Sequence, residues 1–348
     1  MITYKKSGVD DEKAEMLVAL IRQQVKQASF PRRMSPDIGF FGGFIPVSTG
    51  NKKRYLVASC DGVGTKILIA KTLEKYDTIG IDLVAMNCND VAVCGAKPLF
   101  FLDYIAVGKL KIEREQKIIE GIIKGCEIAQ CVLAGGETAQ MPDVYSEDDL
   151  DLAGFCTGIV ETDKILGPLK VKKDDVLLGV ASNGLHSNGF SLVRKVLLSG
   201  RGVKRMLRAY QIPLGRSLGE ELLRPTYIYS AVLSHLAENR LIHAAAHITG
   251  GGIPGNLVRI LPEQMDAEIY LNSWQIPQIF HMIQHSGKVV QKEMFNVFNM
   301  GIGLIMALPE RNVDRVQLIV RKHGFRSFLI GCMCPGKGRV RFLKKPVG

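Results

Sequence analysis

Several common features are missing from this sequence of 348 residues, and each absence excludes a class of protein. No apolar run approaches the roughly 18–20 residues that a membrane-spanning helix needs. The stretch Asp10–Ala28 places apolar residues at helical spacing between charges, which predicts an amphipathic helix and not a signal peptide. The sequence also lacks a Walker A loop, a Gly-x-Ser-x-Gly motif and a Cys-x-x-Cys pair. We therefore expect no membrane partner, no P-loop and no serine nucleophile.

The cysteines are scattered, and most of the eight lie in apolar surroundings. Cys94 follows Val91-Ala92-Val93, and Cys156 follows Gly154-Phe155. Buried, reduced thiols are typical of cytoplasmic proteins, so we expect a cytoplasmic location.

The formal net charge of +11 raises the question of whether the protein binds nucleic acid. The basic residues gather around 201–208 and 337–345, without interleaved aromatic residues or a known binding motif. Such stretches are usually solvated faces, and an excess of positive charge also steers small polyanionic substrates. We expect no nucleic-acid partner, and a nucleic-acid-binding protein without catalytic activity is the alternative of another class.

The length favours two domains. In the first half we expect strands at 55–60, 99–107, 132–134 and 152–160, and helices at 78–94 and 113–130. Gly167-Pro168 and the charged residues after it indicate a boundary between domains 1–167 and 168–348. In the second half we expect strands near 176–181, 242–248, 300–307 and 327–333, and a helix at 191–198. The pattern alone leaves α+β and mixed α/β open.

The segment Asp61–Lys66 directly follows an apolar strand and combines the parts of a metal–nucleotide site. Asp61 offers a hard oxygen ligand, and Gly62 and Gly64 let backbone N–H groups approach an anion. Thr65 supplies a hydroxyl and Lys66 a positive charge where a helix begins. Glycine between a strand and a helix is also ordinary turn chemistry, so this alternative stays open.

The apolar helix at 78–94 carries polar residues that need a reason. Asp82 and Asn89 share one face, and Asp90 lies about 80° around the helix from Asp82. Carboxylates in apolar surroundings cost free energy unless they are paired or bind metal. We expect Asp90 to bind Mg²⁺ together with Asp61, and Glu137, which follows a short apolar strand, to be a third ligand. The alternatives are a solvated Asp90 and a tight turn with an exposed Glu137.

Two loops of the second half combine small polar residues with glycine and histidine. The first, Ser182–Phe190, precedes a helix, and His186 within it can bind phosphate or exchange protons near neutral pH. The second, His247–Gly252, ends in three glycines, which often permit close backbone approach to a ligand. Plain turns are the alternative for both loops.

With these motifs in order, the chain resembles the phosphoribosylformylglycinamidine cyclo-ligases, also called aminoimidazole ribonucleotide synthetases. Each matching segment is weak alone, but the set spans nearly the whole chain: 4–10, 61–66, 77–86, 98–104, 135–142, 153–156, 186–194, 246–252 and 298–303.

The resemblance implies a fold and an activity. The fold is α+β with two domains: an N-terminal domain whose small sheet pairs across a homodimer, and a C-terminal mixed α/β domain. The activity is an ATP- and Mg²⁺-dependent ring closure in purine biosynthesis. ATP phosphorylates the formamide oxygen of formylglycinamidine ribonucleotide, and a substrate nitrogen then expels phosphate from the iminophosphate.

The resemblance also implies roles for individual residues. Lys66, His186 and His247 are the expected catalytic residues, and Asp61, Asp90 and Glu137 the expected metal ligands. We expect ATP or phosphate to contact Gly42, Gly43, Phe44, Gly62, Gly64, Thr65 and Lys66. We expect the substrate to contact His186, Ser187, Asn188, Gly189, Thr249, Gly250 and Gly251.

Two parts of the chain depart from the family pattern. The loop Ile38–Pro46 has an unusual order of glycines, and the basic tail after Gly336 has no match. The rivals of the same superfamily are thiamine-monophosphate kinase, selenophosphate synthetase and the hydrogenase-maturation dehydratase. The cysteine-bearing segments typical of the last two are missing, and the full motif set disfavours the kinase.

Overall fold

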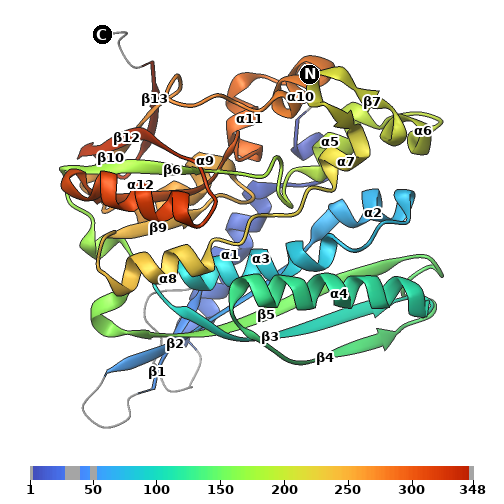
Figure 1. Ribbon diagram of the computed structural model, residues 1–348, viewed down its shortest axis with the longest axis horizontal. Helices are drawn as coiled ribbons and strands as arrows, with labels where there is room; N and C mark the ends of the chain where they lie inside the picture. Colours follow the sequence, from blue (N-terminus) through green and yellow to red (C-terminus); the bar gives the residue numbers. More distant parts are fainter. Residues whose placement is uncertain (1–2, 28–39, 48–52, 345–348) are drawn as a thin grey trace.

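The computed structural model describes residues 3–27, 40–47 and 53–344. Two β-sheets, each with its own helices, lie one above the other in Figure 1, and helices α3 (Ile79–Val93) and α8 (Ser230–Glu238) lie between them. The fold is therefore α+β with two sheet-based halves, in agreement with the expected class. Within the described residues, no helix is both long and apolar enough to cross a membrane.

The first sheet has five strands in the order β1-β2-β5-β3-β4. Only β3 and β4 pair in parallel, and the other neighbours are antiparallel. The strands are β1 (Gly43–Pro46), β2 (Arg54–Gly62), β3 (Lys97–Val107), β4 (Val132–Gln140) and β5 (Leu150–Glu161).

Strand β4 is longer than the sequence predicted. We expected it to end before Gly135, but it pairs with β3 as far as Gln140. A register shift between Phe101 and Leu102 leaves Ala134 without a partner on β3, and the next residue, Gly135, has a φ of +152°, which suits glycine. The alternative of a tight turn at Glu137 is therefore wrong, because Gly135–Thr138 continue the strand, although Glu137 is exposed as that alternative had it.

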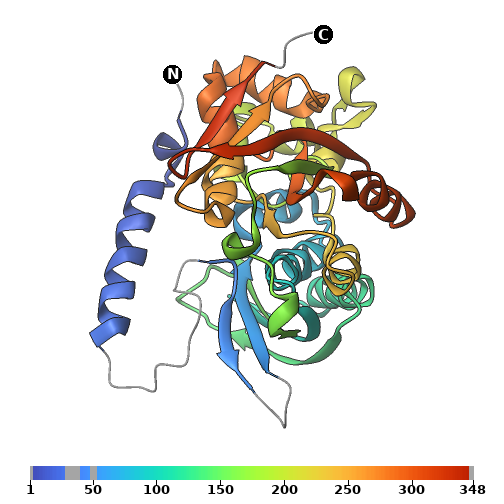
Figure 2. The same cartoon turned by 90° about the vertical axis from the view of Figure 1, so that its left-hand side faces the viewer.

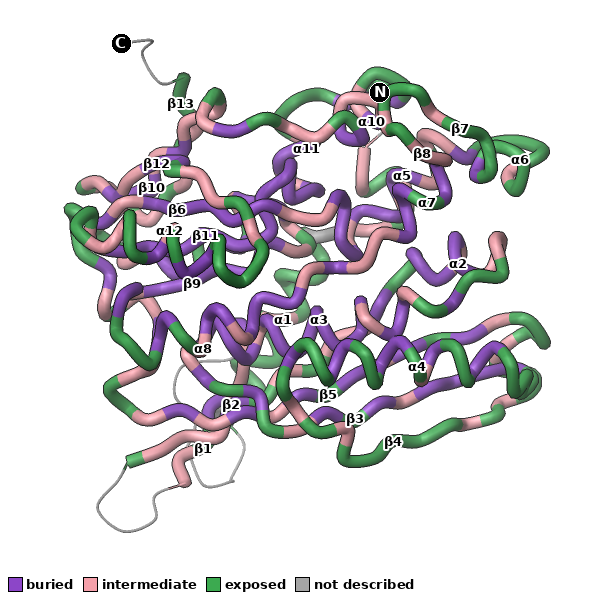
Figure 3. The backbone as a smooth tube through the Cα atoms, in the orientation of Figure 1, coloured by how far each residue is buried: buried purple, intermediate pink, exposed green. Residues whose placement is uncertain are grey.

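One face of the first sheet is covered by α3 and α4 (Ile112–Ala129), and the described residues leave the other face open. Phe101 and Cys156 are buried, whereas their neighbours Leu102 and Phe155 are exposed, as strand alternation requires. Helix α3 is buried along almost its whole length, as Figure 3 shows, and its polar residues Asp82, Asn87 and Asn89 are buried too. The other helices of this half are α1 (Asp11–Gln27), which stands apart from the body in Figure 2, and α2 (Ile67–Leu73).

The second sheet has six strands in the order β13-β10-β12-β6-β11-β9. Only β10 and β13 pair in parallel. The internal strand β11 is buried at seven of its eight positions, because elements pack on both of its faces. The strands are β6 (Asp175–Ala181), β9 (Ala244–His247), β10 (Met265–Tyr270), β11 (Ile302–Pro309), β12 (Ser327–Pro335) and β13 (Val340–Leu343), with a separate hairpin of β7 (Tyr210–Gln211) and β8 (Arg216–Ser217).

Short helices surround the second sheet. Besides α8 they are α5 (Phe190–Leu197), α6 (Val203–Arg208), α7 (Leu218–Leu222), α9 (Gly252–Leu257), α10 (Gln278–Gly287), α11 (Gln291–Val297) and α12 (Val313–Lys322). The predicted helix at 191–198 corresponds to α5, whose start at Phe190 directs the preceding loop toward the first half of the chain.

Candidate functional site

A pocket of about 500 Å³ lies between the two halves of the molecule. The segment Asp61–Thr65 forms one wall, and the segment Ser187–Ser191 forms another. The two loops that the sequence singled out separately therefore lie side by side. The remaining lining comes from Tyr4, Val9, Cys60, Met86 and Asp151–Ala153.

Direct contacts join the two walls. The Oγ1 atom of Thr65 lies 3.1 Å from the Oγ atom of Ser191, and Ser187 donates a hydrogen bond of 2.9 Å to the carbonyl of Val63. Hydroxyls and glycine N–H groups at the start of a helix are typical of anion sites. The pocket thus has the chemistry of a phosphate site shared between two domains.

Lys66 belongs to the same sequence motif but does not line this pocket. Its side chain is fully buried, and its Nζ atom lies 2.7 Å from Oδ2 of Asp82. The same ammonium donates to the carbonyls of His186 and Arg224 at 3.1 and 2.6 Å. Burial lowers the pKa of Lys66, and the charge of Asp82 opposes that shift. The structure therefore uses Lys66 to join the halves and does not direct its charge toward the pocket.

The polar face of α3 also joins the two halves. Asp82 accepts hydrogen bonds from the N–H and the hydroxyl of Thr226, and Asn89 accepts from the N–H of Tyr229 and donates to the carbonyl of Tyr227. Because these residues are seven positions apart, they lie on one helix face, as the sequence predicted. Their partner is the segment 226–229 of the second half, which explains the polar residues on an apolar helix.

His186 is buried beside this junction, with an exposed fraction of 1%. Its Nε2 atom accepts the N–H of Asn183 at 2.9 Å, so the neutral ring carries its proton on Nδ1, which has no hydrogen-bond partner. Burial lowers the pKa of His186 well below its usual value, and the charges of His247 and Lys66 add to this shift. The side chain shapes the loop, while its neighbours Ser187, Asn188 and Gly189 line the pocket.

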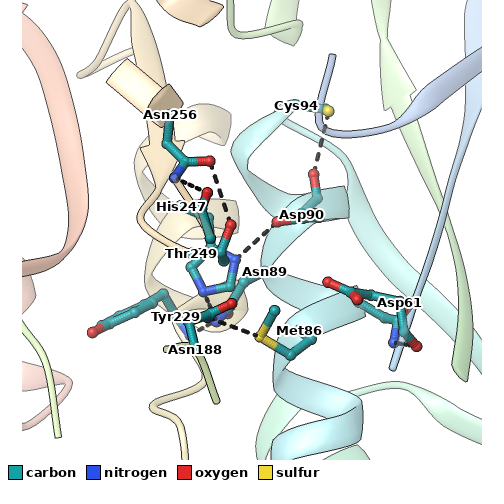
Figure 4. A network of polar contacts seen from close by, with 12 residues as sticks. Asp61, Met86, Asn89, Asp90, Cys94, Asn188, Tyr229, His247, Thr249 and Asn256 are labelled. Atoms are coloured by element: carbon teal, nitrogen blue, oxygen red, sulfur yellow. Dashed lines mark hydrogen bonds and ion pairs between the residues drawn. The ribbon is translucent and has the colours of Figure 1, made fainter. Parts of the chain in front are cut away.

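Asp90 and His247 meet across the same junction, as Figure 4 shows. The Nδ1 atom of His247 lies 2.8 Å from Oδ1 of Asp90, and its Nε2 atom lies 3.3 Å from the amide nitrogen of Asn89. The amide of Asn89 can donate to Nε2, which leaves the proton of His247 on Nδ1 for Asp90. His247 is fully buried, so its clearest role in this arrangement is to orient Asp90.

Asp61 lies opposite α3 in Figure 4. Burial and the charge of Asp90 together raise the pKa of Asp61 to about 6, whereas the N–H of Gly62 and the charge of Arg259 act in the opposite direction. Two carboxylates that repel each other in a partly buried place form a site that a cation would stabilise.

The loop after β9 completes this region. The hydroxyl of Thr249 donates to Asn256, and Asn256 donates to the carbonyls of Gly250 and Gly252. A Cβ atom on Gly250 would lie 3.7 Å from Oδ1 of Asn188, so this loop approaches the pocket wall. Gly251 has a φ of +85°, which suits glycine at the start of α9.

Comparison with known proteins now decides the family. Residues 44–160 match the family described as AIR synthase related protein, N-terminal domain, and residues 172–344 match its C-terminal domain. The phosphoribosylformylglycinamidine cyclo-ligase of Pseudothermotoga lettingae is 48% identical over 335 residues, which are 96% of this chain and 98% of that protein. This chain belongs to the phosphoribosylformylglycinamidine cyclo-ligase family. Its members are ATP-dependent ligases of purine biosynthesis.

Solved structures of more distant proteins share the fold of this cyclo-ligase. AaThiL complexed with AMPPCP and TMP has a TM-score of 0.63 at 16% identity, with coverage of 95% of this chain and 94% of that one. PurL of Thermotoga maritima complexed with FGAR has a TM-score of 0.59 at 16% identity, with coverage of 90% and 47%. At this identity the similarity shows the fold alone.

One expected metal ligand of the cyclo-ligase does not join the others. Glu137 is exposed on β4. It pairs with Tyr104 of β3, Tyr104 pairs with Ala153 of β5, and Ala153 pairs with Gly62 of β2. Three strand spacings of about 4.8 Å place Glu137 about 14 Å from the β2 strand that bears Asp61. Within the described part of the chain, no group of three or more histidine, cysteine, aspartate or glutamate residues is placed to hold a metal ion. The three-carboxylate cluster is therefore wrong for a single chain.

The glycine-rich loop of the cyclo-ligase is only partly described, since Ile38 and Gly39 lie outside the described residues. Phe44 is buried in the core, and a Cβ atom on Gly42 would lie 2.8 Å from Val57. Gly43 begins β1. These residues pack against β2, and none of them lines the pocket.

Three contacts were not expected from the sequence: Ser191 and Met86 line the pocket, and Thr226 is the partner of Asp82. Ser191 lies next to the loop that we selected, so extending that loop into the first turn of the helix would have found it. Thr226 precedes a helix without any motif, so no local signal indicates its contact with α3.

Proposed function

We propose that this chain converts formylglycinamidine ribonucleotide and ATP into aminoimidazole ribonucleotide, ADP and phosphate. The single observation that carries the proposal is the pocket between the halves, whose two walls, Asp61–Thr65 and Ser187–Ser191, come one from each of the two matched family domains. The 48% identity with the phosphoribosylformylglycinamidine cyclo-ligase of Pseudothermotoga lettingae supports the same reaction.

The proposed reaction has two steps. The formamide oxygen of the substrate takes the γ-phosphoryl group of ATP, which gives an iminophosphate and ADP. A nitrogen of the amidine side then attacks the activated carbon, the C–O bond breaks and phosphate leaves. Because the closure is intramolecular, the protein gains most of its rate by holding the substrate in a reactive geometry.

The pocket supplies groups suited to this task. Thr65, Ser187, Asn188 and Ser191 offer polar contacts to phosphate oxygens, and the N–H groups around Gly64 and Gly189 add donors. The buried residues His186, His247 and Lys66 position the walls. Their proposed role is to hold the shape of the site, without contact with the reacting atoms.

Asp61 and Asp90 fit a divalent cation. Their mutual repulsion raises the pKa of Asp61, and Mg²⁺ commonly binds one or two carboxylates together with substrate phosphates and water. Bound there, the cation would neutralise phosphate charge, and His247 would hold the Asp90 carboxylate in place through its Nδ1–H group.

We also propose a homodimer in the cytoplasm with domains 1–167 and 168–348. The open face of the first sheet exposes Leu99, Leu102 and Phe155. Leu102 and Phe155 lie directly opposite each other on β3 and β5. A contiguous apolar face is typical of a protein interface, so this face is the proposed contact with a second copy.

An activity assay tests the reaction. Purified protein is incubated with ATP, Mg²⁺ and formylglycinamidine ribonucleotide, and both ADP and the aminoimidazole product are measured. We expect both to form in equal amounts. Absence of substrate-dependent ADP release would refute the proposal, and salt-sensitive binding to arbitrary duplex DNA would favour the alternative based on charge.

The Asp90→Asn variant tests the proposed metal site. The amide keeps an acceptor for His247 but removes the charge, so we expect turnover to fall more than tenfold, at least about 1.4 kcal/mol of barrier, with a higher Mg²⁺ requirement. Steady-state rates against Mg²⁺ concentration measure this effect. Asp314→Asn on the exposed face of α12 is the matched control and should retain normal rates. Normal turnover of Asp90→Asn at unchanged Mg²⁺ demand would remove Asp90 from the site.

A further inference from the structure

Four of the eight cysteines converge behind the site, although they are far apart in the sequence. Cys88 lies on α3, Cys126 on α4, Cys131 just before β4 and Cys156 on β5. The Sγ atom of Cys88 lies 3.5 Å from that of Cys156 and 3.9 Å from that of Cys131. All four are free thiols in the structure.

The thiols of this cluster differ in their access to solvent. Cys88, Cys126 and Cys156 are buried, whereas Cys131 is partly exposed. Cys156 lies on the helix-covered face of the sheet, because its neighbour Phe155 is on the open face. The cluster is therefore separate from the apolar face that we propose for the dimer, and Cys131 is its one member that a small solute can reach.

A bound metal does not account for the cluster, because no group of cysteines among the described residues is placed to hold one. Hydrogen bonds from the thiols of Cys126 and Cys88 hold the pKa of Cys131 below the usual value of a thiol. A thiol that is accessible and stabilised as thiolate is the kind that peroxides oxidise.

We propose that Cys131 is a peroxide-reactive thiol and that Cys88 resolves it, so that mild oxidation forms a Cys88–Cys131 disulfide. The Cys131 sulfur attacks one oxygen of hydrogen peroxide, the O–O bond breaks, and sulfenic acid and water form. The Cys88 sulfur then attacks the Cys131 sulfur, the S–O bond breaks, and the hydroxide leaves as water with the Cys88 proton. Two thiols are oxidised, and one peroxide is reduced to two waters.

A disulfide at Cys88 would restrain helix α3 close to the junction between the two halves. Asn89 and Asp90 follow Cys88 directly on α3, and both contact the second half of the molecule. The bond would tie this helix to the segment between α4 and β4. Oxidation would then restrain the helix that carries one wall of the interdomain junction.

Peptide mapping tests the proposal on the full-length protein. Native protein is treated with hydrogen peroxide, denatured, blocked with N-ethylmaleimide and digested without reduction. We expect the loss of two of the eight thiols per chain, one peptide pair linking Cys88 to Cys131, and full reversal by dithiothreitol. The test does not depend on the proposed enzymatic activity.

Single variants identify the partners. Cys131→Ser should abolish the linked peptides, whereas Cys126→Ser should leave them in place. Cys60→Ser, at the exposed cysteine outside the cluster, is the matched control for the mapping and should give the same linked peptides as the parent protein. A Cys88–Cys156 or Cys126–Cys131 link would overturn the proposal, and so would oxidation of Cys60 while all four clustered thiols stay reduced.

Discussion

The two ends of the segment Asp61–Lys66 have opposite environments. Asp61 to Thr65 line an open pocket, whereas Lys66, the next residue, is fully buried against Asp82. A sequence motif therefore need not act as a unit. One end offers polar groups to a ligand, and the other fixes the relative position of the two halves that form the pocket.

The two ends differ in whether their charged side chains have oppositely charged or hydrogen-bonding partners within the protein. The Lys66 ammonium is ion-paired with Asp82 and donates hydrogen bonds to the carbonyls of His186 and Arg224. A buried charge with a complete set of partners can persist, but it has no capacity left for a ligand. Asp61 and Asp90 repel each other instead, so their region gains from an added cation.

Breaking the buried pair should have the largest effect. In Lys66→Met the Asp82 carboxylate stays buried without its counter-charge, so we expect the free energy of unfolding to fall by about 3–5 kcal/mol. Urea unfolding followed by circular dichroism measures this change.

The double variant Lys66→Met/Asp82→Asn is the control for the pair. It removes both charges and keeps an acceptor for Thr226, so we expect it to recover most of the lost stability. If Lys66→Met instead keeps its stability and loses only turnover, Lys66 contacts the reacting phosphate after all, and the contrast between the two ends disappears.

The buried ring of His186 should make the stability of the protein depend on pH, which tests the closed side of the same contrast. Its ring is held neutral in the folded protein, with a pKa well below that of the unfolded chain, about 6.5. As the pH falls below this value, the unfolded state binds a proton that the folded state does not. Stability is therefore complete above about pH 6.5 and falls by up to about 1.4 kcal/mol per pH unit below it.

Urea unfolding at pH 7.5 and 5.5 measures this loss. His186→Asn removes the titrating ring, and asparagine tolerates the φ of +60° at this position. We expect the parent protein to lose about 1.4 kcal/mol more than the variant over this interval. Equal losses in both proteins would mean that the ring is protonated or solvated in the folded state.

Much of the fold could be predicted from local pattern. Helix α3 and strands β2, β3 and β5 lie within a few residues of their expected positions, because each is an apolar run ended by glycine, proline or charge. Strand β4 could not be predicted in full. Its glycines indicate a turn locally, and only the parallel neighbour β3 makes them a strand.

The pocket walls were predictable, but the orientation of single side chains was not. Glycines and hydroxyls at a strand–helix junction indicate an anion site from the local sequence alone, and this chain has two such junctions. Whether Lys66 faces the pocket or Asp82 depends on a long-range contact between α3 and the segment before α8. Periodicity predicted that Asp82 and Asn89 share a face, but it did not identify the segment that covers this face.

The smallest expected effect concerns the hydroxyl contact between the two walls. Ser191→Ala removes the group that lies 3.1 Å from Thr65, at a partly exposed position where stability should change by less than about 0.5 kcal/mol. Loss of one neutral hydrogen bond to a bound ligand costs about 1 kcal/mol, so we expect the KM for ATP or for the ribonucleotide to rise about fivefold. Initial rates over both substrate concentrations measure this rise, with Ser286→Ala on the exposed side of α10 as the control. Unchanged KM values for both substrates would show that the open end of the motif, like its buried end, serves only to join the two halves.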